Sequence, residues 1–319
     1  MTRIEGHVLE PGLLTTVQDA SGRPGLGRFG IPPGGAMDAP AARLANRLVG
    51  GQGDEALLEL TWLGPTIRWT TAVHLGLAGG DLDATADGIH LHPGHSHRLA
   101  AGTVLRFGTA RAGARGYLAV EGGLEVPQVL GSAATDRRSG FGGLEGRALA
   151  VGDVLHGPGG PLGPVRSAVG LSVGADDRRI PVVATSSSLG WFDPAALTRL
   201  VDTAWVVAPD ADRSGIRLTG GALAASASGI DSLGVPVGAI QVPPSGEPIV
   251  TMTDGPVTGG YPVVGVVAPA AIGRLAQRGP GATVRFELVE AEAARALVAS
   301  EDAVSIVADP GDVAASWAR

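Results

Sequence analysis

Short apolar runs, separated by turn residues, fill most of this chain of 319 residues. Residues 8–18 read as strand, Pro-Gly turn and strand, and from residue 57 to 157 apolar runs alternate with Gly, Pro and Asp turns. The 51 glycines and 23 prolines are spread along the whole chain, so they punctuate many short strands. The pattern therefore predicts a mainly β protein built of barrels or sandwiches.

A few segments have helical spacing instead. In residues 38–49 Asp38 can cap a helix, Pro40 suits its first turn, and Leu44 and Leu48 share one face. Residues 193–203 have the same Asp-Pro start, and residues 290–304 predict a closing helix. We expect a few helices beside the strands.

The chain contains an internal repeat. Residues 57–107 and 239–286 share a strand-like run, a Gly/Pro turn, a second apolar run, a Gly-Gly pair and a final Arg-Phe. A repeat this long predicts two copies of one domain rather than a solenoid. We expect a first β-barrel domain at 1–157, a linker at 158–167 and a second barrel domain at 168–319, with a cleft between them.

Composition excludes several kinds of chemistry. The chain has no cysteine, and its 24 basic residues are all arginine, so thiol nucleophiles, Schiff bases and covalently attached biotin are excluded. A net charge of −7 argues against a nucleic-acid partner. No long apolar window and no signal-peptide pattern occur, so we expect no membrane partner and a cytoplasmic location.

The first candidate site is the loop at 19–38, rich in glycine and proline. With the residue before it, the loop presents Gln18, Asp19, Arg23 and Asp38 on a frame whose backbone N–H groups can approach an anion. Arg23 adds a forked donor suited to carboxylate or phosphate. The same residues also suit a surface loop in which Asp and Arg pair with each other.

The second candidate is the segment from Gln241 to Pro262. Asp254 could act as a general base and Tyr261 could donate to a carbonyl or oxyanion. Polar and glycine positions near them are candidate ligand contacts: Gln241, Ser245, Thr258, Gly259 and Gly260. The alternative is a barrel with proline-bent strands, in which Asp254 is a turn residue.

Three further groups are weaker candidates. Arg137 lies beside a glycine run and could hold an anion, although a solvated arginine is the alternative. Arg213 follows Asp210 before the second repeat much as Arg23 follows Asp19 before the first. The stretch His90–His97 holds four of the seven histidines, which would share one face of a hairpin and could bind zinc or nickel. An exposed histidine-rich hairpin is the preferred interpretation, because no acidic residue in the stretch orients the rings.

The strings around these loops resemble the family of biotin-dependent carboxyltransferases and 5-oxoprolinase C subunits. This family also includes the allophanate-hydrolase-like domain of urea carboxylases and the antagonist of a sporulation kinase inhibitor. The resemblance covers roughly residues 4–290 and is carried by these strings: GLLTTVQD (12–19), GIPPGGAMD (30–38), LGPTIRW (63–69), DRSGIRLTG (212–220), GVPVGAIQVPPSGEPIV (234–250) and TGGYP (258–262).

The resemblance implies two tandem cyclophilin-like β-barrels and a kinase-inhibitor-like partner that resembles the B subunit of 5-oxoprolinase. With a protein that resembles the A subunit, such an assembly opens 5-oxoproline to L-glutamate, using ATP with Mg that is shared with the partner subunits. In that interpretation Asp254 or Asp38 handles protons and Tyr261 donates to a carbonyl or oxyanion, while Gln18, Asn46 and Gln241 orient the amide. Arginines and loop amides would hold the substrate carboxylate and the phosphoryl group.

Two other functions stay open. One is transfer of a carboxyl group to urea or a related amide from a biotin that another protein carries. The other is a regulatory binding protein that sequesters a kinase inhibitor and needs no chemistry of its own.

Overall fold

The structure is a computed structural model that describes residues 3–159, 162–169, 178–185, 190–226, 229–301 and 304–308. The chain divides into two compact units. Unit 1 contains residues 1–22, 34–175 and 304–319, and unit 2 contains residues 23–33 and 176–303. The domain limits 1–157 and 168–319 and the linker 158–167 stay predictions. Residues 160 and 161 of that linker lie outside the described residues.

Unit 1 holds two sheets. The first has the order β11-β1-β4-β9-β6-β7 and the second has the order β2-β3-β10-β5-β8-β12-β23. The strands of the first sheet are β1 (Ile4–Glu10), β4 (Thr66–Trp69), β6 (Thr85–Ala86), β7 (Ile89–His90), β9 (Val104–Arg106) and β11 (Val154–Gly157). Those of the second are β2 (Leu14–Gln18), β3 (Leu57–Thr61), β5 (Val73–Asp81), β8 (His95–Leu99), β10 (Ala112–Val120), β12 (Arg166–Val169) and β23 (Ser305–Ala308).

One face of each sheet contributes to a shared apolar core. Ile67 and Trp69 of the first sheet and Leu60 and Leu75 of the second are all fully buried in one cluster. Because side chains alternate along a strand, this arrangement leaves the opposite face of the second sheet for other contacts. Burial of this apolar surface is the main stabilising contribution to unit 1.

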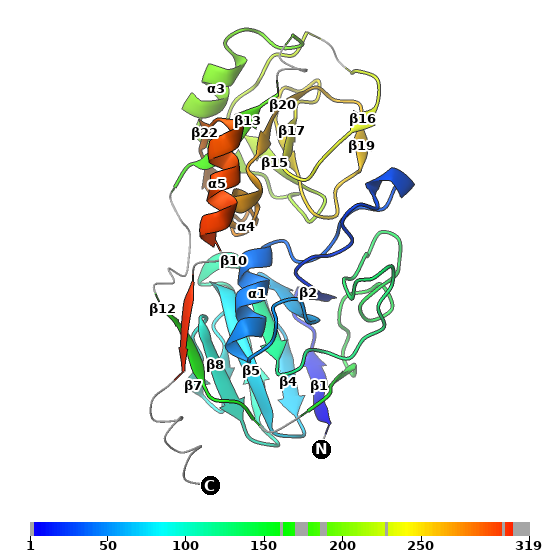
Figure 1. The fold of residues 1–319 in the computed structure, drawn as a ribbon, viewed down its shortest axis with the longest axis vertical. Helices are drawn as coiled ribbons and strands as arrows, with labels where there is room; N and C mark the ends of the chain where they lie inside the picture. Colours follow the sequence, from blue (N-terminus) through cyan, green and yellow to red (C-terminus); the bar gives the residue numbers. More distant parts are fainter. Residues whose placement is uncertain are drawn as a thin grey trace. The chain divides into compact units, whose positions relative to one another are not determined.

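Helix α1 (Ala39–Leu48) packs on that opposite face, against β5 and β10 (Figure 1). Asp38 caps it through its Oδ1, which accepts the backbone N–H of Ala41 at 3.2 Å. Gly76 of β5 permits the close approach, because a Cβ there would lie 2.3 Å from the backbone oxygen of Ala45. The predicted helix and its cap are confirmed.

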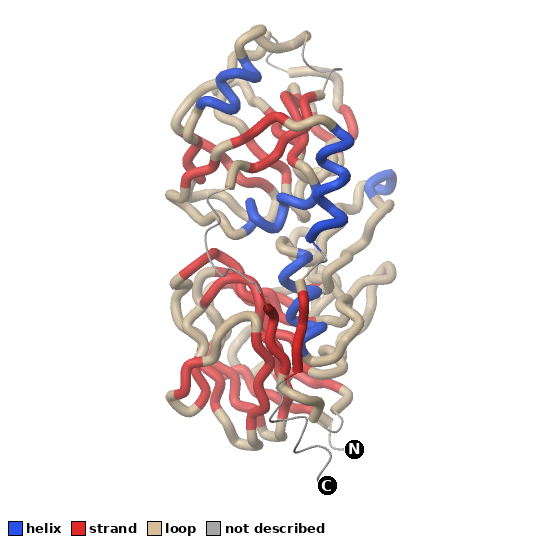
Figure 2. The backbone as a smooth tube through the Cα atoms, turned by 60° about the vertical axis from the view of Figure 1, so that its left-hand side comes forward, coloured by secondary structure: helices blue, strands red, loops and turns tan. Residues whose placement is uncertain are grey.

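Unit 2 is built on one sheet of order β21-β14-β15-β18-β17-β20-β13-β22, with a separate pair β16-β19. The strands are β13 (Ile180–Ala184), β14 (Trp205–Val207), β15 (Gly215–Thr219), β16 (Leu233–Gly234), β17 (Ala239–Gln241), β18 (Ile249–Thr251), β19 (Thr258–Gly259), β20 (Val263–Val267), β21 (Thr283–Val284) and β22 (Phe286–Leu288). Its helical segments are η1 (Gly27–Phe29), α3 (Ala196–Asp202), η2 (Pro269–Ala271), α4 (Ile272–Ala276) and α5 (Ala291–Glu301). Strands prevail over helices throughout (Figure 2), which confirms the mainly β prediction.

Two local predictions differ from the structure. The helix expected from residue 193 begins at Ala196, because the Asp193 carboxylate accepts the Ala195 N–H at 2.8 Å and closes a turn there. The repeated segments also pair differently: β3 and β4 belong to different sheets, whereas β17 and β18 pair directly with each other. The repeat is therefore visible in the sequence pattern but not in these strand pairings.

Candidate functional site

The Asp19 carboxylate accepts a backbone N–H of its own loop, one of the donors that we expected to bind an anion. Its Oδ1 accepts the backbone N–H of Gly22 at 2.7 Å. Its Oδ2 accepts the Ser132 hydroxyl at 2.6 Å and the Ala133 N–H at 2.7 Å. Asp19 is only 5% exposed, so its carboxylate is the anion of this loop, and its role here is to tie residues 19–22 to residues 132–133.

Two other predicted residues of unit 1 hold the ends of α1. Asp38 is the cap described above and is 9% exposed. Asn46 is fully buried, and its Nδ2 donates to the backbone oxygen of Glu55 at 2.8 Å. Asn46 therefore fixes the turn that follows α1.

A buried network that the sequence analysis missed reaches the start of α1. Glu59 Oε2 accepts the Tyr117 hydroxyl and the Met37 N–H, each at 2.8 Å. The Asp38 N–H in turn donates to Tyr117 Oη at 2.8 Å. Burial, followed by the nearby charge of Glu59, raises the pKa of Tyr117 well above its ordinary value, so the phenol keeps its proton. The signal for this network was present in LLELT, where a carboxylate interrupts an otherwise apolar buried strand.

Gln18 lies on the same sheet face and is fully buried. Its Nε2 donates to Thr16 Oγ1 at 3.0 Å and to the backbone oxygen of Thr135 at 3.5 Å. The structure thus gathers Gln18 and the start of α1 on one polar face of unit 1, together with Glu59 and Tyr117.

The predicted base of unit 2 lies in an ion pair. Asp254 accepts from Arg213 through both oxygens, from Nε to Oδ2 at 2.7 Å and from Nη2 to Oδ1 at 2.9 Å. The side chains are 7% and 16% exposed, and the Asp254 N–H donates to the Arg213 backbone oxygen at 3.0 Å. This geometry clamps two turns together and occupies both carboxylate oxygens.

The remaining residues of the second candidate segment surround β17 and β19. Gln241 is 5% exposed, and Gly259 leaves room for its amide, since a Cβ on Gly259 would lie 2.5 Å from Gln241 Nε2. Thr258 and Gly259 form β19, and the backbone oxygen of Gly260 accepts the Ile230 N–H at 2.8 Å. Tyr261 is 40% exposed. Ser245 is exposed in a turn, where its Oγ accepts the Glu247 N–H at 3.3 Å.

The two other predicted arginines differ in burial. Arg23 is 2% exposed and belongs to unit 2, where its backbone N–H donates to Pro33 O at 2.6 Å. Arg137 is exposed on a turn closed by the bridge Asp136↔Phe141. Its position agrees with the alternative interpretation of a solvated arginine.

The histidines of residues 90–97 do not form the expected hairpin. His90 belongs to β7, whereas His95 and His97 belong to β8 of the other sheet. The rings still follow one another, with His90 and His92 stacked at 4.6 Å between centroids. Burial lowers the pKa of His97 to about 4. Asp83 Oδ1 lies 3.4 Å from His90 Nε2, and within the described residues no group of three or more His, Cys, Asp or Glu side chains could hold a metal ion.

The described residues form no metal site made by the protein alone. Within the described ranges no group of three or more His, Cys, Asp or Glu side chains is arranged to hold a metal ion. The chain has no lysine, and Asp19 occupies loop amides that a phosphate would need. We therefore assign no step through ATP to residues of this chain.

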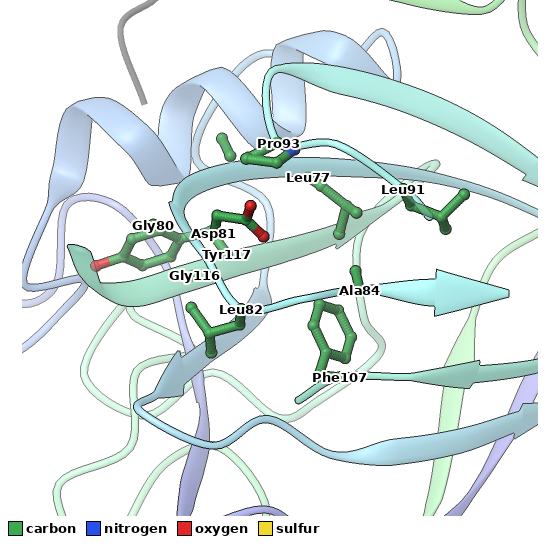
Figure 3. Close-up of a pocket in the computed structure, with 11 residues that line it drawn as sticks. Leu77, Gly80, Asp81, Leu82, Ala84, Leu91, Pro93, Phe107, Gly116 and Tyr117 are labelled. Carbon is green, nitrogen blue, oxygen red and sulfur yellow. The ribbon is translucent and has the colours of Figure 1, made fainter. Parts of the chain in front are cut away.

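A small pocket in unit 1 lies beside the polar face but is apolar. Leu77, Leu82, Leu91 and Phe107 line it together with the ring of Tyr117 (Figure 3). The Tyr117 hydroxyl points away from these side chains, toward its hydrogen-bond partner Glu59. None of the described residues that line this pocket is a predicted site residue.

Candidate residues thus lie in two sets, one in each unit. The cleft expected between the two domains stays a prediction. Within the described residues, no helix of the structure is long and apolar enough to cross a membrane.

Comparison with known proteins identifies the family. The chain is 35% identical to the C subunit of 5-oxoprolinase from Escherichia coli over 300 residues, which cover 92% of this chain and 94% of that protein. It is 32% identical to urea amidolyase of Lachancea kluyveri, of which it spans only 18%. The crystal structure of Kluyveromyces lactis urea carboxylase matches 95% of this chain with a TM-score of 0.85 and 30% identity, and the chain covers 29% of that structure.

The family model described as carboxyltransferase domain, subdomain A and B, matches residues 29–288. This match covers most of both units and includes the polar face of β3 and β10 and the Arg213–Asp254 pair. The chain therefore belongs to the carboxyltransferase subdomain A and B family.

Proposed function

We propose that the chain is the C subunit of an ATP-dependent 5-oxoprolinase, an enzyme that opens the lactam of 5-oxoproline to L-glutamate. In the net reaction water adds to the lactam carbonyl carbon, the ring C–N bond breaks and the nitrogen is protonated. ATP is hydrolysed to ADP and phosphate in the same cycle. The assembly would work in the cytoplasm, where ATP is available, together with partners that resemble the A and B subunits of the enzyme.

One observation carries this proposal. The match to the C subunit of the Escherichia coli 5-oxoprolinase extends over 94% of that protein, so the chain corresponds to a whole subunit of that enzyme. A second relative with the same name, from Haemophilus influenzae, is 33% identical and is covered to 93%. The urea amidolyases, in contrast, share only a small part of their length with this chain.

The site residues suggest separate roles in proton transfer, in orienting the lactam and in binding the nucleotide. Both oxygens of Asp254 accept from Arg213, so its carboxylate joins two turns of unit 2. We assign proton transfer to Asp38, the other carboxylate proposed for that role, whose Oδ1 also caps α1. Gln18 and Gln241 are buried amides suited to orient the lactam, and Tyr261 is exposed enough to donate to its carbonyl oxygen. Mg and ATP would be held chiefly by the partner subunits, in keeping with the absence, among the described residues, of a cluster of three or more metal-ligating side chains.

A carboxyltransferase that acts on urea or a related amide is the second candidate. The similarity in fold to the Kluyveromyces lactis urea carboxylase favours it. Because this chain has no lysine, the biotin would have to be attached to another protein. That requirement separates the two candidates in an experiment.

The test is reconstitution with the candidate partners. The chain is co-purified with proteins that resemble the A and B subunits, and glutamate and phosphate are measured after addition of 5-oxoproline and ATP. Equal release of both products supports the proposal. Absence of turnover in the complete mixture, combined with carboxylation of urea when a biotinylated carrier is supplied, would replace it with the second candidate.

A further inference from the structure

Two paired strands of unit 1 carry connections of the chain to unit 2. β12 ends at Val169, and the chain then passes into unit 2, which resumes at residue 176. It returns to unit 1 at residue 304, just before β23. The two strands pair antiparallel, with Val169 opposite Ser305 (Figure 1). The outgoing and the returning connection therefore begin at the same end of one strand pair.

Backbone pairing holds this strand pair to its sheet at few positions. Within the described ranges, β12 pairs with β8 at one register position, Ser167↔His95. One further backbone bond runs from the Ala168 N–H to Gly94 O at 2.8 Å. β23 comes last in the order of the sheet, so it depends on β12 in turn. The residues that precede β12 are therefore important for the position of both strands.

These preceding residues, 162–165, form a strap that charged side chains hold against unit 1. The Gly163 N–H donates to Glu121 Oε2 at 3.0 Å. Gly163 O accepts from Nε and Nη2 of Arg98, at 2.9 and 2.6 Å. Just after the strap, Arg166 Nη1 donates to the backbone oxygen of Leu48 at the end of α1, at 3.3 Å. Gly163 is thus held from both sides, by an anion and by a cation.

His74 of β5 lies directly under the strap. Its side chain is fully buried, and its Nδ1 lies 3.1 Å from the same Glu121 oxygen that accepts the Gly163 N–H. A Cβ on Gly163 would lie 3.5 Å from His74 Nδ1, so the strap rests on the ring. His74 Nε2 is buried and has no hydrogen-bond partner among the described residues. The neutral ring therefore donates its Nδ1–H to Glu121 and leaves Nε2 without a proton.

A second proton on this ring is poorly accommodated while the strap is in place. It would sit on Nε2, where no acceptor waits for it within the described residues. It would also add a positive charge beside Arg98, which is opposite His74 in the strand register, and near Arg166. Burial lowers the pKa of His74 although Glu121 opposes the shift, and the two arginines lower this pKa further. His97, the neighbour of Arg98 on β8, also interacts with the charge of His74.

We propose that the strap is an acid-sensitive clasp, which fixes β12 while His74 is neutral and opens when His74 takes up a second proton. In the open state water surrounds the ring, and Gly163 leaves Glu121 and Arg98. The open state binds the proton more readily than the closed state, so a falling pH shifts the equilibrium toward opening. Opening frees the start of β12, and with it the strand pair from which both connections leave.

The test is hydrogen–deuterium exchange of the full chain at pH 7.5 and pH 5.5, corrected for the intrinsic effect of pH on exchange. The N–H groups of Gly163 and Ala168 report the clasp, and those of β3 and β10 report global unfolding. Protection of the clasp amides should fall about five- to tenfold at pH 5.5. The reason is that an exposed histidine, with a pKa near 6.5, is mostly protonated there.

Two histidine variants locate the titrating group. His74→Gln can still donate to Glu121 but takes up no proton, so the fall in protection of the clasp amides should disappear. His97→Gln is the matched control, because that histidine lies on the neighbouring strand and its Nε2 contacts His92 O rather than the strap. The clasp amides of His97→Gln should keep their response to acid.

A second measurement tests the fastening itself at constant pH. Trypsin cleaves after arginine, and Arg166 stands at the end of the strap. Glu121→Gln keeps the size of the side chain and removes its charge, which weakens its bonds to Gly163 and His74. Cleavage after Arg166 at pH 7.5 should become several times faster. Glu125→Gln, which removes an exposed carboxylate paired with Arg3, should leave the rate unchanged.

Three results would overturn the clasp. These are equal protection of the clasp amides at the two pH values in the wild type, a full acid response in His74→Gln, or equal cleavage rates in Glu121→Gln and Glu125→Gln. If His74→Gln does not fold, the wild-type exchange and the cleavage rates still decide. None of these measurements needs turnover by the assembly, so the clasp and the proposed function are tested separately.

Discussion

The polar residues of unit 1 and unit 2 are satisfied in different ways. In unit 2, Arg213 and Asp254 complete each other, because two short hydrogen bonds join opposite charges and occupy both carboxylate oxygens. In unit 1, Glu59 and Tyr117 are joined by a hydrogen bond, whereas Gln18 Oε1 and Thr61 Oγ1 on the same sheet face make no hydrogen bond within the described residues. The pair in unit 2 is closed by protein groups alone, whereas the polar face in unit 1 is not closed by the protein groups of the described residues.

This difference changes which predicted carboxylate we propose for proton transfer. From the sequence, Asp254 was the natural candidate for a base because it lies among glycines with little regular structure. In the structure both Asp254 oxygens accept from Arg213, so this carboxylate is paired within the fold. The carboxylate that we propose for proton transfer is Asp38 in unit 1. The comparison can be tested by disturbing each set in turn.

The largest effect is expected from breaking the closed pair. Arg213→Met leaves the Asp254 carboxylate, 16% exposed, without its cation and should lower the free energy of unfolding by about 3 kcal/mol. Urea unfolding measures this loss. The double variant Arg213→Met/Asp254→Leu removes both charges and should recover most of it. If the single and double variants are equally unstable, the pair does not act as a unit.

The second-largest loss of stability is expected at Asp19, whose carboxylate is the anion in its own loop. Asp19→Asn replaces a carboxylate that accepts three hydrogen bonds and turns an NH₂ group toward at least one donor. We expect a loss of about 2 kcal/mol in thermal or urea unfolding. Ser132→Ala removes one of the three donors and should lose about half as much. Addition of phosphate or sulfate should not rescue Asp19→Asn if the carboxylate has only this structural role.

The sequence allowed much of this fold to be predicted. The strand-turn pattern indicated a mainly β protein, and Asp38 with Pro40 indicated the start of α1, because both signals act between residues close in sequence. Glu59 and Tyr117 were missed because their partnership depends on the pairing of β3 with β10, which brings together residues 58 positions apart.

The roles of Asp19 and Asp254 could not be predicted for a related reason. Each is a polar residue in a glycine-rich segment, a pattern common to ligand sites and to structural turns. Only the three-dimensional partners, Ser132 and Ala133 in one case and Arg213 in the other, decide between them. Residue type and spacing contain no information on whether an oxygen is already occupied.

A smaller effect should appear when the pH is lowered. The pKa of His97 in unit 1 is about 4, mainly because of burial, whereas an unfolded histidine titrates near 6.5. As the pH falls from about 6.5 to 4, the unfolded chain takes up a proton that the native state refuses, so stability decreases. Allowing for solvent screening of a partly exposed ring, we expect a loss of about 1 kcal/mol between pH 7 and pH 5.

His97→Gln removes this titrating group, and its urea unfolding curves at the two pH values should lie closer together than those of the wild type. His7→Gln is a suitable control, because that ring is 42% exposed. An equal acid response in wild type and His97→Gln would contradict the assignment.

The smallest change in stability is expected at Asp38, where two roles can be separated. Serine caps helices about as well as aspartate, so Asp38→Ser should keep the acceptor for the Ala41 N–H and change the free energy of unfolding by only about 0.3 kcal/mol. It also removes the carboxylate that we propose for proton transfer, and glutamate release by the reconstituted assembly should fall at least a hundredfold. Asp38→Ala loses both functions and should in addition lose about 1 kcal/mol of stability. Full activity in Asp38→Ser would reduce Asp38 to a helix cap, and the polar set of unit 1 would then be as purely structural as the Arg213–Asp254 pair of unit 2.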